Sequence, residues 1–335
     1  MVVYGQEVKG QGVGSAYEEM VQLLENHARN ELQISINNSK DAQLNHIHTI
    51  HPSCFFQMFT SSLPNCMHVH FLPETIEGSI KLPDFIQSAY YDYVIKMYQK
   101  ANELIVVNPI FIDDLVKYDI PRENISYIPN VVASDRFFPK DIPADDPLRK
   151  KYHMPKDCFN VISVGQVQTR KGVLDFIDIA KMMPDVNFLW VGGFSFGRVT
   201  DGYEELEKIA NNPPKNVHFL GIIDRDQMNT IYNMADLLLM TSYNELFPMS
   251  ILEAVNAKRP ILLRDLDLYE KIYFTDYLKA KNSNEFVDLI YKLRDDPLTQ
   301  ERAKKASEDI STFYSEEYVA KLWIEYYRRI HQKWS

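Results

Sequence analysis

The sequence predicts an α/β protein of two domains, each built around a doubly wound parallel sheet of the Rossmann type. Segments with strand character alternate with segments of helical periodicity through both halves of the chain, a pattern typical of parallel sheets covered by helices. With 335 residues, the chain is also too long for one ordinary hydrophobic core. The segment 137–155 is rich in proline and charge, which is linker composition. We therefore expect domains at 1–145 and 156–312, followed by a C-terminal helix at 313–335.

The first half begins with a predicted strand at 2–4, a loop containing Gly10, Gly12 and Gly14, and a helix at 15–28. A glycine loop before a helix suits close approach to phosphate or sugar, because glycine has no side chain and the first helical N–H groups are free. The alternating glycines do not form the dinucleotide motif GxGxxG, so the loop by itself is not specific.

Further strands are expected at 32–37, 46–51 and 66–72. The last of these carries His68 and His70 on one face, because side chains alternate along a strand. Both histidines can be structural, or His70 can face a ligand at the strand end. A metal site would need more ligands, and the helical motifs HxxxH and HExxH are missing from the sequence.

Residues 83–101 form a predicted helix rich in aromatic residues, with Lys96 and Lys100 near its end. The helix fits either a packed core position or an interfacial position in contact with lipid. Strands at 103–108 and 125–132, with a helix between them, complete the first half.

The second half starts again with a strand at 159–165, a loop at 166–172 and a helix. Arg170 and Lys171 lie at the start of this helix, where cations and free N–H groups could hold a diphosphate. A solvated turn with two basic residues is the alternative. Further strands are expected at 186–193, 217–223, 236–240 and 260–265, and a ligand belongs at the carboxyl ends of such strands.

Two carboxylates follow the strand at 236–240 within an apolar segment. Glu245 lies at or just before the start of a predicted helix at 247–257, and Glu253 lies about two turns along it. One interpretation makes Glu245 a charge that complements the helix dipole and Glu253 a solvated residue. The other is a nucleotide-sugar site, with Glu245 against the sugar and Glu253 against the ribose, because carboxylates in apolar surroundings need partners.

Composition excludes several classes of protein. The net charge of −10 argues against non-specific nucleic-acid binding. Three scattered cysteines form neither a metal motif nor a disulfide framework, which indicates a reducing, cytoplasmic setting. We expect no secretory leader and no membrane span, because no apolar run approaches the ~20 residues that a span needs. The P-loop motif GxxxxGK[ST] is also missing from the sequence.

An ordered set of motifs resembles the retaining GT-B glycosyltransferases of family 4 over nearly the whole chain. The set consists of the loop around Gly12, IPN at 128–130, VG and RKG within 164–172, FLG at 219–221, YNMADLLLMTS at 232–242 and ELFPMSILEA at 245–254. The resemblance implies the GT-B fold, in which two Rossmann-like domains face a cleft and the last helix crosses back to the first domain. The first domain would bind the acceptor and the second a nucleotide-sugar donor.

The same resemblance implies the site residues. Glu245 would contact the donor sugar at the reacting centre, and His70 would lie against the sugar, so both are expected catalytic residues. Lys171 would bind the donor diphosphate and Glu253 the ribose. The remaining donor contacts are expected at Gly12, Gln166, Arg170, Phe247, Pro248, Met249 and Ser250. Gln166 stands where the family usually has arginine, and Pro248 removes one N–H from the phosphate cradle.

Four segments are similar to bacterial enzymes that add a second hexose to monoglucosyl-diacylglycerol: KGQGVGSAY, HVHFLPETIEGSIKLP, VGQVQTRKGVLDF and RDLDLYE. This similarity implies transfer from UDP-galactose, or else UDP-glucose, with retention and without a metal or other cofactor. The enzyme would be cytoplasmic and bind peripherally to the anionic inner face of the cell membrane, through the segment around Tyr90 to Lys100 or through the terminal helix. The alternatives are a different acceptor (polysaccharide, teichoic acid or protein), a GT-B nucleotide-sugar epimerase, or an inactive GT-B partner subunit.

Overall fold

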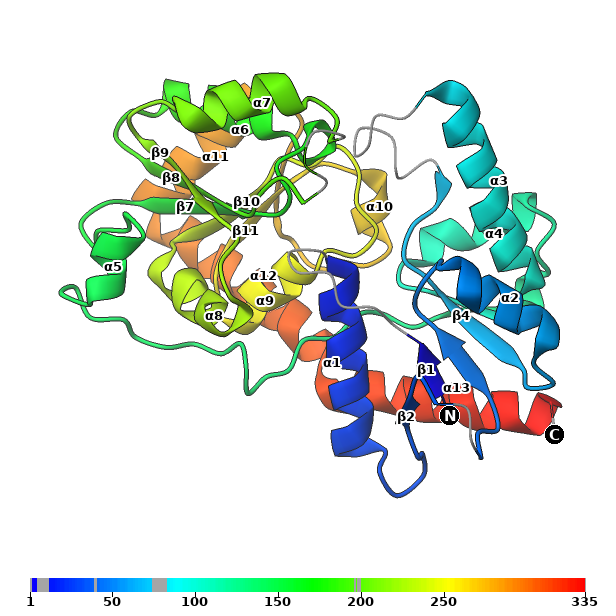
Figure 1. Cartoon of the computed structure of the whole chain (residues 1–335). Coiled ribbons are helices and arrows are strands. Elements are labelled where there is room, and N and C mark those ends of the chain that lie inside the picture. The colour runs from blue at the N-terminus through cyan, green and yellow to red at the C-terminus, as the bar shows by residue number, and fades with distance from the viewer. Residues whose placement is uncertain are drawn as a thin grey trace. The chain divides into compact units, whose positions relative to one another are not determined.

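The computed structural model describes residues 2–4, 12–38, 41–73, 83–195, 197 and 200–334. These residues form two compact units. The first unit contains the described residues up to 73, residues 83–133 and residues 314–334, and the second contains residues 134–313. Each unit has a parallel sheet with helices packed around it, which confirms the predicted α/β class (Figure 1).

The sheet of the first unit has the strand order β2-β1-β3-β4-β5-β6, and its pairings are parallel. Its strands are β1 (Val2–Tyr4), β2 (Ser35–Ile36), β3 (Asn45–Ile47), β4 (Asn65–Val69), β5 (Glu103–Val106) and β6 (Ile125–Tyr127). Parallel neighbours need crossover connections. These contain the helices α1 (Gly12–His27), α2 (Pro52–Thr60), α3 (Asp84–Lys100) and α4 (Ile112–Lys117), with short 3₁₀ helices η2 (Pro109–Phe111) and η3 (Arg122–Asn124).

The chain after β3 departs from the expected strand over 46–51. β3 ends at Ile47, and Pro52 begins α2, a helix that the sequence patterns did not predict. Proline is favoured in the first turn of a helix because its missing N–H has no helical partner there. The His51 ring completes this start by accepting a hydrogen bond from the Ser53 backbone N–H. Residues 48–51 therefore lead into a helix rather than extend the strand.

The last helix, α13 (Glu316–Trp334), packs into the first unit, as the GT-B resemblance implies. It buries Trp323 and Tyr327 in one cluster with Met20 and Leu24 of α1. The Trp323 and Tyr327 rings stack with their centroids 5.5 Å apart. Because this packing uses the main aromatic residues of α13, they are not available to lipid. Trp334 at the end of α13 stays 43% exposed, so contact of the terminal helix with lipid stays a prediction.

The sheet of the second unit has the strand order β12-β11-β10-β7-β8-β9, again with parallel pairings. Its strands are β7 (Asn160–Val164), β8 (Asn187–Val191), β9 (Val217–Gly221), β10 (Leu237–Met240), β11 (Ile261–Arg264) and β12 (Leu278–Ala280). Its helices are α5 (Pro147–Lys151), α6 (Val173–Met182), α7 (Tyr203–Asn211), α8 (Arg225–Met234), α9 (Met249–Asn256), α10 (Asp267–Glu270), α11 (Ser283–Asp295) and α12 (Pro297–Phe313), with the 3₁₀ helix η4 (Thr169–Lys171).

Two features of the second unit follow directly from its sequence. β10 reads Leu-Leu-Leu-Met and is buried throughout, because helices cover both faces of a parallel sheet. The segment 137–155, expected to be a linker, contains α5 and is packed. The Arg149 guanidinium is buried and donates to the backbone carbonyls of Ile142, Pro143 and Met154.

Candidate active site

The loops after β7 and β10 meet at one end of the second sheet, because the two strands are parallel neighbours. The backbone N–H of Tyr243 donates to the Arg170 carbonyl at 2.8 Å, and the Thr241 hydroxyl donates to the Gly172 carbonyl at 2.8 Å. Gly172 has a φ of +69°, and a Cβ there would lie 2.1 Å from the Thr241 carbonyl oxygen. Glycine is therefore required where the two loops approach each other.

Lys171 and Arg170 both face Glu245, a buried carboxylate in the loop before α9. The Lys171 Nζ contacts Glu245 Oε1, and Arg170 Nη1 lies 3.5 Å from Glu245 Oε2. Burial by itself raises the pKa of Glu245, but the charges of Lys171 and Arg170 hold that pKa below its usual value. Burial lowers the pKa of Lys171, and the carboxylate offsets this only in part. The cluster therefore concentrates two positive charges and one negative charge away from bulk water.

The structure excludes one of the two interpretations of the glutamates. α9 begins at Met249, well after Glu245, and its first turn holds no acidic residue. Glu245 is 5% exposed and Glu253 is 6% exposed. The interpretation of Glu245 as a helix-start charge and of Glu253 as a solvated residue is therefore wrong. Both are buried carboxylates that need partners.

Glu253, on α9, finds its partners on α8. The Tyr232 hydroxyl donates to Oε2 at 2.8 Å, and Arg225 Nη2 lies 3.2 Å from Oε1. Burial and the charge of Glu253 raise the pKa of Tyr232 well above its usual value, so the hydroxyl remains a donor. A carboxylate can accept about four hydrogen bonds, and contact of Glu253 with a ribose stays a prediction. We had not predicted Arg225 and Tyr232, although Tyr232 belongs to the motif YNMADLLLMTS.

The residues from Phe247 to Ser250 connect the Glu245 loop to α9. Phe247 is buried, and its ring stacks on Tyr273 with the centroids 5.9 Å apart. Met249 is also buried, and Pro248 precedes the helix without a side-chain cap. The side chains of Phe247 and Met249 therefore serve packing, and an anion would meet the backbone. The first N–H groups of a helix lack helical acceptors, so the start of α9 suits an anion.

A second glutamine joins Gln166 in the loop after β7. Gln166 is partly exposed, whereas Gln168 is fully buried. Neither the amide oxygen nor the amide nitrogen of Gln168 has a hydrogen-bond partner among the described residues. Buried amides are rarely left in this state, so Gln168 is a further candidate contact for a polar ligand. It was missed because a loop glutamine carries no motif signal.

His70 and Gly12 belong to the first unit. His70 follows β4, and its Nε2 lies 3.1 Å from Nδ1 of His48. Burial lowers the pKa of His70 to about 4, so its ring is neutral at pH 7. Gly12 is the first residue of α1, which begins earlier than the predicted start at 15. The rest of the expected loop, up to residue 11, lies outside the described residues. Contacts of His70 and Gly12 with a donor stay predictions.

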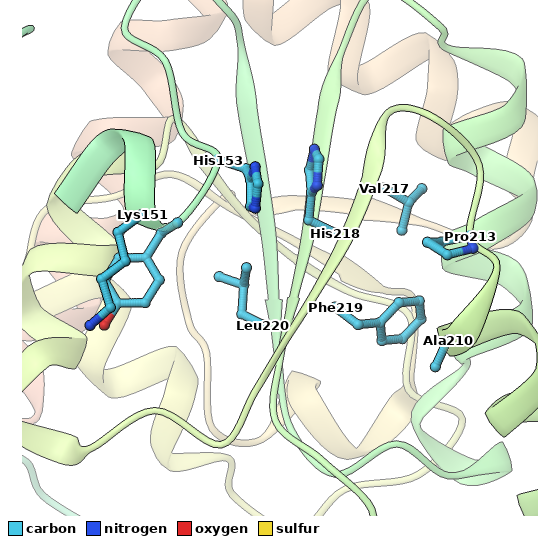
Figure 2. Close-up of a pocket in the computed structure, with 9 residues that line it drawn as sticks. Lys151, His153, Ala210, Pro213, Val217, His218, Phe219 and Leu220 are labelled. Carbon is cyan, nitrogen blue, oxygen red and sulfur yellow. The ribbon is translucent and has the colours of Figure 1, made fainter. Parts of the chain in front are cut away.

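A separate depression in the second unit has a volume of about 430 Å³. Figure 2 shows the His153 and His218 rings facing each other in it, and their centroids are 4.5 Å apart. His218 lies near the start of β9, and His153 precedes β7. This depression therefore lies at the amino ends of the strands, opposite to the end where the Glu245 cluster sits. It is not the candidate active site.

Comparison with known proteins agrees with the fold and with the motifs. A family model described as glycosyl transferases group 1 matches residues 145–310. The chain is 41% identical, over 98% of its length and 88% of the relative's, to alpha-galactosylglucosyldiacylglycerol synthase from Streptococcus pneumoniae. It is 26% identical, over 90% of each chain, to a processive diacylglycerol alpha-glucosyltransferase from Acholeplasma laidlawii.

Solved structures share the fold at low sequence identity. The Anabaena protein HepE, solved in complex with UDP and glucose, matches with a TM-score of 0.76 and 15% identity over 98% of each chain. Sucrose-phosphate synthase from Thermosynechococcus elongatus matches with a TM-score of 0.80 and 15% identity over 99% of each chain. These similarities confirm the GT-B fold that the motifs imply. With its full-length relative at 41% identity, the chain belongs to the group 1 glycosyl transferases and is a glycosyltransferase.

Proposed function

We propose that the protein transfers a hexose from a UDP-sugar to monoglucosyl-diacylglycerol, with galactose favoured over glucose and with retention at the anomeric carbon. The relative that shares 41% identity is named as a galactosylglucosyldiacylglycerol synthase. Two further relatives, both from Acholeplasma laidlawii, are named as enzymes of glucosyl-diacylglycerol synthesis. A diglycosyl-diacylglycerol of the bacterial cell envelope is the product that these names support.

The observation that carries the proposal is the buried cluster of Lys171, Arg170 and Glu245 at the carboxyl ends of β7 and β10. Ligands of open parallel sheets bind at this end. We assign the donor diphosphate to Lys171 and Arg170, and the sugar hydroxyls to the Glu245 carboxylate. The ion pairs hold these groups in place before the donor arrives, and such preorganisation lowers the reorganisation needed for reaction.

The rest of the donor would lie along α9. Glu253 would accept hydrogen bonds from the ribose hydroxyls, with Arg225 and Tyr232 fixing its orientation. The amino end of α9 would add free N–H groups and the positive end of a helix dipole near the phosphates. Arg170, Lys171 and α9 thus supply positive charge to the leaving diphosphate. We therefore propose that the transfer reaction needs no metal ion.

In the proposed mechanism the acceptor hydroxyl attacks the anomeric carbon from the face that the diphosphate leaves. The bond from the anomeric carbon to the phosphate oxygen breaks, and the leaving phosphate takes the acceptor proton. Lys171 and Arg170 stabilise the negative charge that develops on this phosphate. Glu245 and His70 would position the sugar, so the protein contributes mainly orientation and electrostatics.

The acceptor lies in a membrane, which requires contact with a lipid surface. No helix of the described residues is long and apolar enough to cross a membrane. α2 exposes Phe56 and Phe59, which are 76% and 60% exposed, and Lys100 of α3 lies 4.6 Å from the Phe59 ring centroid. Exposed aromatic side chains beside lysines suit the headgroup level of an anionic membrane. We propose peripheral binding to the inner face of the cell membrane through α2 and α3.

Product analysis tests the proposed function. Purified protein is incubated with monoglucosyl-diacylglycerol micelles and either UDP-galactose or UDP-glucose, and NMR then identifies the added sugar and its anomeric configuration. We expect an α-linked dihexosyl lipid, formed faster from UDP-galactose. An epimerase would instead release free or UDP-linked sugar without an acceptor, and an inactive subunit would release nothing. Transfer to a polysaccharide, teichoic acid or protein, without transfer to the lipid, would show that the proposed lipid acceptor is wrong.

A further inference from the structure

Four buried or half-buried histidines form a compact array on one face of the first sheet. His46 lies in β3 and His48 follows it, while His68 lies in β4 and His70 follows it. β3 and β4 are parallel neighbours, with His46 opposite Cys66. Since alternate residues of a strand share a face, this register places His48 beside His68. The ring centroids of His46 and His48 are 4.3 Å apart, and those of His48 and His68 are 4.7 Å apart.

Three of these rings carry nitrogen atoms that have no partner among the described residues. They are Nε2 of His46, Nε2 of His48 and both ring nitrogens of His68. The three residues are at most 4% exposed. Buried polar side-chain atoms are usually hydrogen-bonded, and a group of unpartnered ones in one place requires an explanation. The proposed transfer reaction does not use these three residues.

We propose that His46, His48 and His68 bind a divalent first-row transition metal ion, zinc in the first instance, inside the first unit. One ligand nitrogen from each of the three residues lies within 4.8 Å of the other two. Zinc binds imidazole nitrogen at about 2.0–2.1 Å and is commonly held by three histidines with a fourth position open. Small rotations of the rings would therefore bring all three nitrogens onto one ion.

The opposite nitrogens of two rings are already oriented, as in known metal sites. His46 Nδ1 lies 2.6 Å from the Tyr327 hydroxyl, and His48 Nδ1 lies 3.1 Å from His70 Nε2. Metal-bound histidines typically donate their other N–H to an acceptor, usually a carboxylate, a backbone carbonyl or water, which fixes the ring and its tautomer; here the Tyr327 hydroxyl and the His70 ring take that place. In this arrangement Nδ1 of both His46 and His48 carries the proton, and Nε2 of each is free to bind the metal.

The surroundings of the array separate it from bulk water. Trp323 lies against the array, with its centroid 5.4 Å from that of His46 and 5.9 Å from that of His68. The ion would therefore enter as the unit folds and exchange slowly afterwards.

This site differs in place and purpose from the donor site. Lys171 and Glu245, which we assign to the donor, belong to the second unit, whereas the three proposed metal ligands belong to the first. The proposed ion therefore shares no ligand residue with the donor site. Its effect would be to hold β3 to β4. It would also keep the proton of His70 on Nδ1, because His70 Nε2 accepts the hydrogen bond from His48.

Metal analysis of the full chain tests the proposal. The protein is expressed without a polyhistidine tag in zinc-supplemented medium, passed through gel filtration, and analysed by inductively coupled plasma mass spectrometry. We expect about one zinc per chain in the wild type and less than about a tenth of this in His68→Gln, because three ligands are needed. His218→Gln, which removes a histidine of the second unit, should keep the full zinc content. Equal zinc content in His68→Gln and in the wild type would overturn the proposal.

A second measurement does not depend on whether the variant folds. Wild-type protein expressed with Co²⁺ in place of Zn²⁺ should show the visible absorption of cobalt bound to histidine nitrogen, at one ion per chain. A wild-type protein that contains neither zinc nor cobalt after these preparations would also overturn the proposal. Neither readout involves a donor or acceptor sugar, so the result is independent of the transfer assay.

Discussion

Lys171 and Glu245 form a buried ion pair although 74 positions of sequence separate them. Their side chains are 13% and 7% exposed, so neither charge is well solvated. Removing one partner of such a pair leaves an uncompensated buried charge, which is strongly destabilising. Arg170 softens this dependence, since its guanidinium lies 3.5 Å from the same carboxylate. The pair therefore links the stability of two loops to the charge distribution of the proposed donor site.

Replacing Lys171 with methionine removes the charge and keeps much of the side-chain length. We expect kcat/KM for the UDP-sugar to fall by about 10²–10³-fold, the usual cost of losing one preorganised group at a developing negative charge. Steady-state kinetics measures this change. Lys181→Met alters an exposed lysine of α6 and should leave kcat/KM as in the wild type. An unchanged kcat/KM in Lys171→Met would contradict the assignment of the diphosphate.

Glu245 gives the protein a pH-dependent stability. Its folded-state pKa is depressed, so the unfolded chain binds more protons in acid, and the stabilisation is lost as the pH falls through the folded-state pKa. The stabilisation is fully present above the ordinary glutamate pKa of about 4.3. We expect urea unfolding to show a larger free-energy difference between wild type and Glu245→Gln at pH 7 than at pH 3. Equal differences at both pH values would contradict this prediction.

The same Glu245→Gln variant also tests catalysis. A carboxamide cannot accept from the sugar hydroxyls as a carboxylate does, and it no longer pairs with Lys171. We expect kcat to fall more than KM rises. Single-turnover rates measured at pH 7 separate this effect from a loss of folded protein, and full transfer rate in the variant would remove Glu245 from the reacting centre.

Gly172→Ala is expected to destabilise the protein more than Gly221→Ala does. Both glycines have a φ of +69°, so both substitutions carry the strain of a left-handed alanine, about 1–2 kcal/mol. A Cβ at Gly172 would also meet the Thr241 carbonyl oxygen at 2.1 Å, whereas a Cβ at Gly221 would meet no atom of the described residues within 4 Å. Denaturant unfolding compares the two variants. Equal losses of unfolding free energy would show that the loops after β7 and β10 can move apart to admit the Cβ without a loss of stability.

Tyr232→Phe removes the hydroxyl that donates to Glu253 at 2.8 Å. One lost hydrogen bond corresponds to about 0.5–1.5 kcal/mol. We therefore expect KM for the UDP-sugar to rise by about 2- to 12-fold with little change in kcat, because ribose binding is the same in the ground and transition states. Tyr291→Phe, which breaks the bond to Asp185 in an exposed pair, is the matched control. A large fall in kcat at constant KM would argue that Tyr232 acts on the reacting centre instead.

Phe56→Ser combined with Phe59→Ser tests the membrane surface. Both side chains are exposed on α2, and removing two phenyl groups should weaken binding to anionic vesicles by at least about tenfold. Vesicle flotation with phosphatidylglycerol measures the bound fraction. Phe274→Ser changes a 67% exposed phenylalanine of the second unit and should not alter flotation. If the α2 double variant floats as the wild type does, another surface contacts the membrane.

Local sequence patterns predicted the strands in which every residue is buried. The apolar run of β10 reports a strand covered on both faces, and this holds whatever its neighbours are. The segment 46–51 was harder, because its alternating histidines and apolar residues have the period of a strand. Pro52 and the N-cap residue His51 start a helix at residue 52 and so end the strand early. This signal consists of only two residues, and a periodic pattern over six residues conceals it.

The partners within the candidate site depend on packing rather than on spacing. Tyr232 is 21 positions from Glu253, and which face of α8 turns toward α9 is not set by any local motif. Likewise, the sequence did not indicate which further histidines would lie beside His68 and His70. Only the parallel register of β3 with β4 brings His46 and His48 beside them. Sequence patterns thus identified the charged residues of the candidate site, whereas the residues that contact them became known only from the order and packing of the strands and helices.

The position of α13 in the first unit has a consequence for how the protein is made. The first unit is interrupted by residues 134–313, about 180 residues, before α13 supplies its last part. At a synthesis rate of about 5–20 residues per second, the nascent first unit waits roughly 10–40 s for this helix. During that interval the side chains of Met20 and Leu24 on α1 lack the cover of Trp323 and Tyr327. The early part of the chain is therefore exposed to chaperones and proteases until α13 has been synthesised.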